Sequence, residues 1–199
     1  ADLILPMIDS LLAEAGCRLA DLDGLAFGRG PGGFTGLRIA AGVVQGLAFG
    51  AGLRVAPVSS LAAVAYLAQA ALPGQGVMVC NDARMNELYT GCYRFGPAAP
   101  ATPIELAPEM VGPADDIRPR PDVRLVAGNG LPRHPELLAR LEAAGLVHCA
   151  DLYPRAEAVA RLGAAMLRMG AGVAAAEALP TYVRDDVARP ARPVVTGMS

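Results

Sequence analysis

A glycine-rich segment, Gly28–Arg38, is the part of this 199-residue sequence whose residue types and spacing best suit chemistry. It reads GRGPGGFTGLR and stands between a short apolar run and a long one. Backbone N–H groups at a helix N-terminus lack partners within the helix, so a glycine loop that opens a helix can bind an anion. Glycines also allow tight turns with positive φ. The loop alone leaves anion binding and a purely structural turn as open alternatives.

The loop completes no known nucleotide-binding or hydrolase pattern. Gly28, Gly30 and Gly33 satisfy G-x-G-x-x-G, but no acidic residue follows about 20 residues later to hold a ribose. No Gly-Lys-Ser/Thr follows, as a Walker A loop requires, and no serine stands in a G-x-S-x-G elbow. We therefore predict no catalytic residue in this segment. The loop residues that could contact a ligand are Gly30, Gly32, Thr35, Gly36 and Arg38.

The other polar residues form no convincing metal or nucleophile site. The two histidines, His134 and His148, do not form an H-x-x-x-H or H-E-x-x-H pattern, so no metal site is predicted. Asp82, Arg84 and Glu87 follow an expected strand, where a catalytic acid could stand. We interpret them as a solvated turn that contains an Arg–carboxylate pair.

Composition excludes several classes of protein. With 53% hydrophobic residues and a net charge of -2, the chain is neither disordered nor a mainly electrostatic nucleic-acid binder. The longest uncharged run, 55–81, is broken by Pro57 and Pro73, so it predicts no membrane span. The four cysteines form no C-x-x-C pair, and no signal-peptide pattern is visible. These features predict a cytoplasmic protein.

Hydrophobic periodicity predicts alternating helices and strands before Pro73 and a different style after it. Helices are expected over 2–15, 35–50 and 59–72, with strands over 24–28 and 54–58. Gly16 is the expected stop of the first helix, and Ser59 and Ser60 are the N-cap candidates of the third. This order predicts an α/β fold with a parallel sheet covered by helices.

After Pro73 the pattern predicts more strands and two further helices. The strands are expected over 77–80, 87–95, 123–127 and 146–149, and the helices over 134–144 and 155–170. The Pro-rich stretch 97–121 is expected to be mostly loop, with one weak strand near 103–106. A boundary at Pro73–Gly76 divides the chain into lobes 1–74 and 75–199, the second ending in an irregular tail over 180–199.

Three segments resemble the TsaB (YeaZ) family, in the order that this family carries them. Gly28–Gly50 resembles G-P-G-S-F-T-G-[LV]-R followed by a helix of small residues. Asn81–Tyr89 resembles D-A-R-x-x-E-[VL]-Y, and Pro180–Asp185 resembles P-x-Y-[LV]-R. The residues that match these patterns are Gly30, Pro31, Gly32, Phe34, Thr35, Gly36, Arg38, Asp82, Arg84, Glu87, Tyr89, Tyr182 and Arg184.

The resemblance implies a two-lobed actin/Hsp70/sugar-kinase (ASKHA) fold. It implies a role as the non-catalytic dimerisation subunit that supports synthesis of N6-threonylcarbamoyladenosine at position 37 of tRNA. The implied partner is a TsaD-type paralogue, whose H-x-x-x-H metal motif is absent here. A TsaE-type ATPase is a further implied partner, a homodimer is implied when TsaD is absent, and tRNA would be contacted only indirectly. Any ATP or ADP would lie at the interface with the partner, not in this chain alone.

This sequence departs from the family pattern at two places. Position 33 is Gly where the family usually has Ser, which removes a hydroxyl from the loop. The family opens with roughly three strands and an I-D-T-[SA] turn that corresponds to the phosphate loop of actin-like ATPases, whereas this sequence starts at the following helix. We expect a first lobe that is incomplete at its N-terminus and an incomplete nucleotide site.

Two predicted helices, 2–15 and 35–50, are more apolar than packing on one sheet requires. Their surplus faces predict the partner interface, formed by Leu5, Ile8, Leu12, Ile39, Val43 and Leu47. The alternative is an enzyme, either an actin-like ATPase or phosphotransferase or a metallopeptidase-like protein. Such an enzyme needs a phosphate loop or an H-x-x-x-H motif, and the sequence shows neither.

Overall fold

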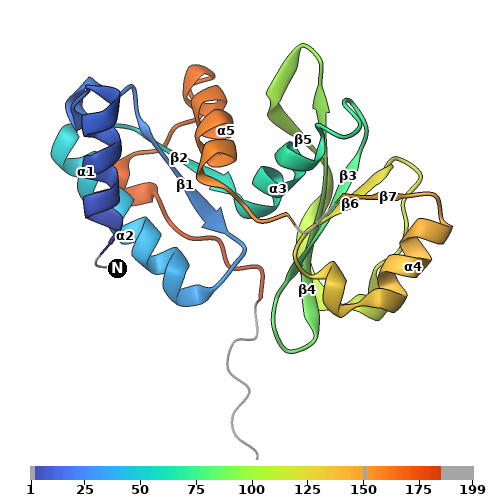
Figure 1. Cartoon of the computed structure of the whole chain (residues 1–199). Coiled ribbons are helices and arrows are strands. Elements are labelled where there is room, and N and C mark those ends of the chain that lie inside the picture. The colour runs from blue at the N-terminus through green and yellow to red at the C-terminus, as the bar shows by residue number, and fades with distance from the viewer. Residues whose placement is uncertain (1–2, 150–151, 185–199) are drawn as a thin grey trace, which may run out of the picture.

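Two sheets lie side by side in the computed structural model, which describes residues 3–149 and 152–184 (Figure 1). Helices pack on both sheets. The first sheet has two strands and the second has five, in the order β5-β4-β3-β6-β7. This mixed arrangement agrees with the predicted α/β class.

The first sheet pairs β1 (Leu25–Gly30) with β2 (Val55–Ser59) in parallel. The two strands are joined by α2 (Phe34–Ala51), as predicted from its apolar run. The sheet-facing side of α2 consists of small and branched apolar residues, which are Leu37, Ala41, Val44 and Ala48. They pack with Phe27 and Val55 on one face of the sheet. Parallel pairing with a helical crossover is the predicted βαβ geometry.

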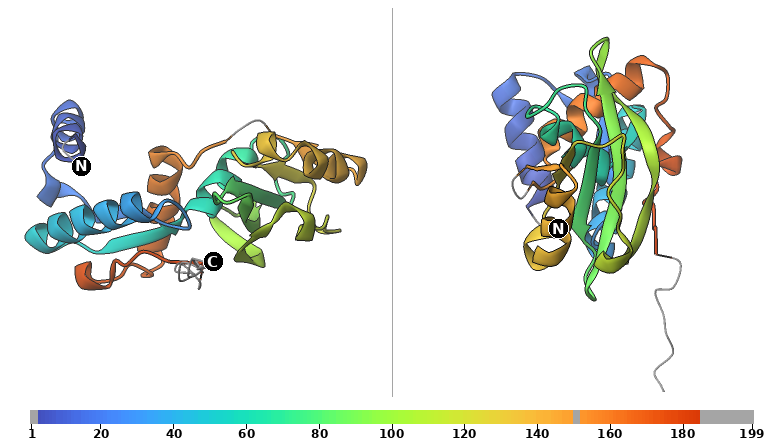
Figure 2. Two further views of the ribbon diagram at one scale, coloured as in Figure 1. Left: turned by 90° about the horizontal axis from the view of Figure 1, so that it is seen from below. Right: turned by 90° about the vertical axis from the view of Figure 1, so that its right-hand side faces the viewer.

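Helix α1 (Ile4–Ala15) precedes this unit and ends at Gly16, whose φ of 64° is left-handed. Such a C-terminal glycine is a common helix stop and was predicted here. No residue of α1 is buried. The left view of Figure 2 shows α1 standing clear of both sheets. The helix therefore contributes nothing to the core of the described chain.

Helix α3 (Ser60–Ala68) connects the two sheets. The Ser59 hydroxyl accepts hydrogen bonds from the N–H groups of Leu61 and Ala62, both at 3.1 Å, so Ser59 is the predicted N-cap. The helix ends four residues earlier than the expected Leu72. Almost every residue of α3 is buried, because it packs on one face of the second sheet and also against the helix formed by residues 156–168.

The second sheet is antiparallel on one side and parallel on the other. Its strands are β3 (Val77–Asp82), β4 (Glu87–Gly96), β5 (Ala99–Pro113), β6 (Leu125–Ala127) and β7 (Val147–His148). β3 pairs antiparallel with β4 and parallel with β6. Helix α4 (Pro135–Ala143) covers the face opposite α3 through Leu137 and Leu141.

The prediction of a mainly loop segment over 97–121 was wrong. Residues Ala99–Pro113 form β5, a 15-residue strand paired with β4. Proline removes a ladder donor, so it is tolerated in a strand only where one side is unpaired. β5 stands at the edge of its sheet, which accommodates Pro100, Pro103 and Pro108.

The predicted assignment of residues 75–199 to the second lobe needs correction. Helix α5 (Ala156–Arg168) packs on β1 and β2, on the face opposite α2 (Figure 2). Gly163 makes this approach close, since a Cβ there would lie 2.4 Å from the Cβ of Ala26. Val173 then forms an antiparallel bridge with Val55. The chain thus returns to the first sheet after completing the second.

The predicted irregular tail is described only over 180–184, which has no regular secondary structure. Residues 185–199 lie outside the described part. Helix α2 is long and apolar enough to cross a membrane by length and composition. That test is also met by core helices of globular proteins, and α2 packs one face on β1.

Candidate functional site

The three sequence motifs meet at one pocket of about 230 Å³ between the two sheets, which we call the motif pocket. The glycine loop supplies one wall, the turn between β3 and β4 a second, and the segment 181–184 a third. The lining residues are Pro31, Gly32, Gly33, Phe34, Ala83, Arg84, Tyr89, Thr181, Tyr182, Val183 and Arg184. Segments up to about 150 residues apart in the chain therefore form a single site.

The glycine loop needs glycine at position 30 for two reasons. Gly30 has φ of 105°, which L side chains rarely adopt. A Cβ there would also lie 2.9 Å from both the Leu37 side chain and the carbonyl oxygen of Thr181. Gly33, in contrast, has nothing within 4 Å of a Cβ position, so a serine of the family pattern would fit without a clash. The backbone therefore requires glycine at position 30, whereas position 33 has room for a side chain.

An aromatic and arginine stack joins the glycine loop to the C-terminal segment. The rings of Phe34 and Tyr182 lie 5.4 Å apart between centroids, tilted by 38°. The Arg38 guanidinium lies 3.8 Å from the centroid of Phe34, and its Nε donates to the Tyr182 hydroxyl at 3.1 Å. Cation–π and hydrogen-bonding contacts of this kind orient an arginine without an acidic partner. Arg38 therefore holds Tyr182 at the rim of the motif pocket.

The turn between β3 and β4 is held in an unusual backbone conformation. Arg84, Met85 and Asn86 all have positive φ, between 53° and 64°. Such values in three successive non-glycine residues are uncommon and are maintained by surrounding contacts. Asp82 supplies one of these, since its Oδ1 accepts from the Arg84 N–H at 2.9 Å.

Asp82, Arg84 and Glu87 make the predicted carboxylate–arginine pairs, although not all with each other. Asp82 Oδ2 lies 3.5 Å from Arg84 Nη1 and 3.2 Å from Arg133 Nη1. Glu87 is paired instead with Arg184, which also donates to the Ala83 carbonyl at 3.3 Å. Asp82 and Glu87, the two carboxylates of this turn, are thus each paired with arginine.

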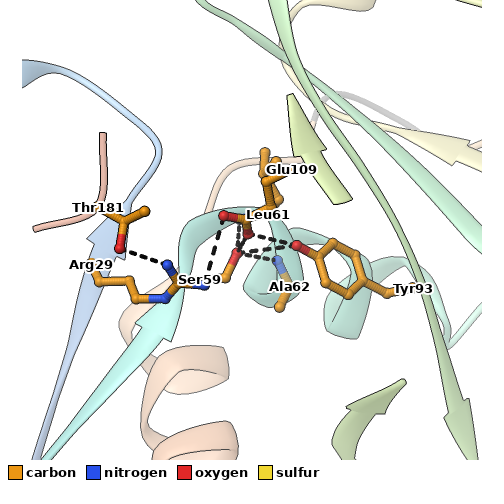
Figure 3. A network of polar contacts seen from close by, with 7 residues as sticks. All are labelled: Arg29, Ser59, Leu61, Ala62, Tyr93, Glu109 and Thr181. Carbon is orange, nitrogen blue, oxygen red and sulfur yellow. Dashed lines mark hydrogen bonds and ion pairs between the residues drawn. The ribbon is translucent and has the colours of Figure 1, made fainter. Parts of the chain in front are cut away.

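A second polar cluster joins the two sheets, and it reaches the motif pocket through Thr181 (Figure 3). Glu109 of β5 accepts hydrogen bonds from the Tyr93 hydroxyl, at 2.6 Å, and from Ser59. Arg29 Nη2 lies 3.7 Å from Glu109 Oε2, while Arg29 Nη1 donates to Thr181 Oγ1 at 2.6 Å. Burial and the neighbouring Glu109 carboxylate raise the pKa of Tyr93, so its hydroxyl stays a donor.

Sequence reasoning missed this second cluster, except for Ser59 as a helix cap. Glu109 lies in the Pro-rich stretch 97–121, which the sequence predicts to be mostly loop. Tyr93 offered a signal for it, because a tyrosine in a buried strand needs a hydrogen-bond partner for its hydroxyl.

The weak loop candidates have different positions in the structure. Gly32 lines the motif pocket, whereas Thr35 and Gly36 are exposed on the first turn of α2 and do not line it. Arg38 and Tyr182 also border a neighbouring, open hollow of about 390 Å³.

The structure describes no group of three His, Cys, Asp or Glu residues that could hold a metal within 3–149 and 152–184.

The residues predicted for the partner interface are partly or largely exposed. Leu5 is exposed. The other five residues are half-buried: Ile8, Leu12, Ile39, Val43 and Leu47. The prediction omitted a second apolar side of α1. Leu3, Met7 and Leu11 are exposed by 75%, 61% and 62%. Their spacing of four residues places them on one side of the helix.

Comparisons with known proteins agree with these features. A family model described as TsaD, tRNA N6-adenosine threonylcarbamoyltransferase, matches residues 1–103. The tRNA threonylcarbamoyladenosine biosynthesis protein TsaB of Escherichia coli K12 is 35% identical over 191 residues, covering 93% of this chain and 80% of that protein. TsaB of Haemophilus influenzae is 56% identical over 86 residues, which are 43% of this chain and 36% of that protein. The chain thus spans about a third of the Haemophilus relative in that match.

Solved structures show the same architecture. A Pseudomonas aeruginosa protein described as similar to peptidase YeaZ superimposes with a TM-score of 0.80 at 38% identity, covering 92% of this chain and 84% of that one. YeaZ from the same organism gives a TM-score of 0.77 at 38% identity, covering 90% and 83%. These likenesses confirm the predicted α/β actin-like fold. On sequence identity, coverage and structure together, the chain belongs to the TsaB (YeaZ) family.

Proposed function

We propose that this chain is a non-catalytic subunit that binds a TsaD-type paralogue and supports N6-threonylcarbamoyladenosine modification of tRNA. Relatives that are 35% and 56% identical are named for biosynthesis of this nucleoside, and the matching family model is that of the transferase. In this proposal the transfer chemistry belongs to the partner, and tRNA is contacted only indirectly. The complex would work in the cytoplasm.

The observation that carries the proposal is the unburied apolar surface of α1. A 12-residue helix with no buried residue gains little from its own fold, yet α1 is apolar on more than one side. Exposed apolar surface rimmed by polar residues marks protein–protein interfaces. Together with Ile39, Val43 and Leu47 of α2, α1 offers a helical surface for a partner's helices. A second copy of this chain would occupy the same surface when the partner is absent.

The motif pocket supports a nucleotide only as a shared site. Its volume of about 230 Å³ is below the roughly 300–1,000 Å³ of typical ligand pockets. An ATP or ADP molecule would therefore need further walls from the partner. A TsaE-type ATPase is the third component in this proposal.

Co-purification with the TsaD-type partner tests the proposal. Val43→Arg places a charge on the half-buried outer side of α2, away from the sheet-facing residues Ala41 and Val44. We expect it to abolish binding while the circular dichroism spectrum is retained, because a charged residue at a buried interface anchor costs about 2 kcal/mol or more. Glu142→Arg, on the exposed side of α4, is the control and should bind normally. Undiminished binding by Val43→Arg would remove α2 from the interface.

Assays of the isolated chain test the non-catalytic part. We expect no threonylcarbamoyl transfer and no hydrolysis of ATP or peptides, because Asp82 and Glu87 are neutralised by arginines. Turnover that disappears in Asp82→Asn or Arg84→Met would show that the chain is an enzyme.

A further inference from the structure

The carboxylate of Glu109 links segments from both lobes. Its side chain is only 9% exposed and receives hydrogen bonds from Tyr93 of β4 and from Ser59 at the start of α3. Its second oxygen faces Arg29 of β1 at 3.7 Å. A buried carboxylate is stable only when it is paired and hydrogen-bonded, and here its three partners come from three separate elements.

An irregularity in the sheet places Glu109 at this junction. Thr90 pairs with Met110 and Cys92 pairs with Ala107, so Pro108 and Glu109 both stand opposite Gly91. Such a bulge re-aims the side chains of the strand that carries the extra residue. Gly91 makes room for the arrangement, because a Cβ there would lie 3.1 Å from the ring of Tyr93.

Arg29 connects Glu109 to the motif pocket. One guanidinium nitrogen faces Glu109, and another donates to Thr181 Oγ1 at 2.6 Å (Figure 3). The Arg29 carbonyl also accepts from the Thr181 N–H at 2.8 Å. Thr181 is therefore held by both the backbone and the side chain of one residue. Its neighbour Tyr182 carries the ring that packs on Phe34 at the pocket rim.

We propose that Glu109 is a positioning residue for the motif pocket, which acts through Arg29 on Thr181 and so sets the place of the Tyr182 ring. Without the carboxylate, the Arg29 guanidinium has no anion on its inner side to fix its orientation. Thr181 then keeps only its backbone bond, and Tyr182 gains freedom. The inference goes beyond the proposed function, because the position of Tyr182 can be observed without any partner.

Fluorine NMR of protein labelled with 3-fluorotyrosine measures this coupling directly. The chain has five tyrosines, so single Tyr→Phe variants assign all five resonances. Glu109→Gln keeps the side-chain shape but turns an amide toward Arg29. We expect it to shift the resonance of Tyr93, which it touches, and also that of Tyr182, by more than the line width. Tyr66 and Tyr153, which lie outside the network, should keep their resonances.

Matched variants separate positioning from a general loss of structure. Glu105→Gln changes an exposed glutamate on the same strand, and we expect it to leave Tyr182 unchanged. Thr181→Val removes only the hydroxyl that Arg29 binds, so it should shift Tyr182 without shifting Tyr93. Thr181→Ser keeps that hydroxyl and should restore the Tyr182 resonance.

The thermal unfolding midpoint does not decide this question, because a purely structural Glu109 would lower it as well. If Glu109→Gln and Thr181→Val both leave the Tyr182 resonance in place, the proposal is wrong and Glu109 only ties the lobes together. If Glu109→Gln fails to fold, Tyr93→Phe decides, because it removes a hydrogen-bond donor of Glu109 and leaves Arg29 and Thr181 unchanged. A shifted Tyr182 resonance in this variant supports the proposal, and an unchanged one overturns it.

Discussion

Arg184 and Glu87, which are 97 residues apart in the sequence, form an ion pair that fastens the C-terminal segment to the β3–β4 turn. Three residues earlier, Thr181 is bound to Arg29 of the first sheet. The segment 181–184 is therefore attached to both lobes, at one end to β1 and at the other to the turn. The walls of the motif pocket keep their spacing through these two attachments.

Arg184→Met should destabilise the chain by about 1–2 kcal/mol. The Arg184 side chain is 19% exposed and that of Glu87 34%, so removing the arginine leaves a partly buried carboxylate without its partner. The cost falls between that of an exposed pair, about 0–1 kcal/mol, and that of a fully buried pair, about 3–5 kcal/mol. Urea unfolding followed by circular dichroism measures the difference.

Arg161→Met is the matched control for this prediction. Arg161 pairs with Glu157 one helical turn away on the exposed side of α5, at 3.0 Å. Helix-surface pairs contribute about 0.3–0.5 kcal/mol, so its loss should be near the limit of measurement. Equal effects of the two variants would mean that the Arg184 pair is no stronger than a solvated one.

Gly163→Ala should destabilise the chain although alanine favours helix formation. A Cβ at position 163 would lie 2.4 Å from the Cβ of Ala26, so α5 must move away from the first sheet. Overpacking of this kind costs about 1–3 kcal/mol. Gly46→Ala in α2 has nothing within 4 Å of its Cβ and should stabilise by about 0.5–1 kcal/mol. A stabilising Gly163→Ala would show that α5 does not pack on β1.

Stability should fall at alkaline pH because of the Cys92 thiol. Burial, opposed in part by Arg120, raises the pKa of Cys92 from 9.0 to about 11. The unfolded chain releases this proton near pH 9, whereas the folded chain keeps it until about pH 11. The contribution of Cys92 to the free energy of unfolding is thus complete below pH 9 and is lost as the pH rises to 11. By pH 10 the free energy of unfolding should have fallen by about 1 kcal/mol from this group.

Unfolding free energies of the wild type and of Cys92→Ala, measured from pH 8 to pH 10.5, test this. Burial raises the pKa of both Cys80 and Tyr93, so these groups act in the same direction, but they are present in both proteins. The difference between the two curves therefore isolates Cys92. Parallel curves would exclude a folded thiol with a raised pKa.

Local patterns accounted for much of the fold. The apolar spacing of α1 and α2, the cap at Ser59 and the stop at Gly16 are all encoded within a few neighbouring residues, and the structure confirms them. β5 was missed because its prolines read as loop, and only its place at the sheet edge makes them acceptable. The return of α5 to the first sheet was missed because chain order does not reveal which sheet a helix packs on.

The site was predictable in its parts but not in its assembly. The glycine loop, the Asp82–Tyr89 turn and the segment around Tyr182 were each identified from their residues. That they line one pocket depends on contacts such as Glu87 with Arg184, which no local pattern contains. Glu109 was missed for a similar reason, because a bulge opposite Gly91 decides where it points.

One edge of β1 has no partner strand among the described residues. Among the described residues β1 pairs only with β2, and Leu25 donates its N–H to the Arg54 carbonyl at 2.9 Å. Amides alternate in direction along a strand, so those of Ala26 and Gly28 point to the other edge, where no strand lies in the described part. Leu25, Ala26 and Phe27 carry no charge or proline that would prevent pairing with another chain.

We expect the Ala26 and Gly28 amides of this 199-residue chain to exchange rapidly with deuterium, and the protein to associate through this edge as its concentration rises. Val79 and Cys80 of β3, which has partners on both sides, should stay protected. Exchange measured by NMR on a dilute monomer decides the matter, since strong protection of Ala26 and Gly28 there would mean that another segment of the chain covers this edge.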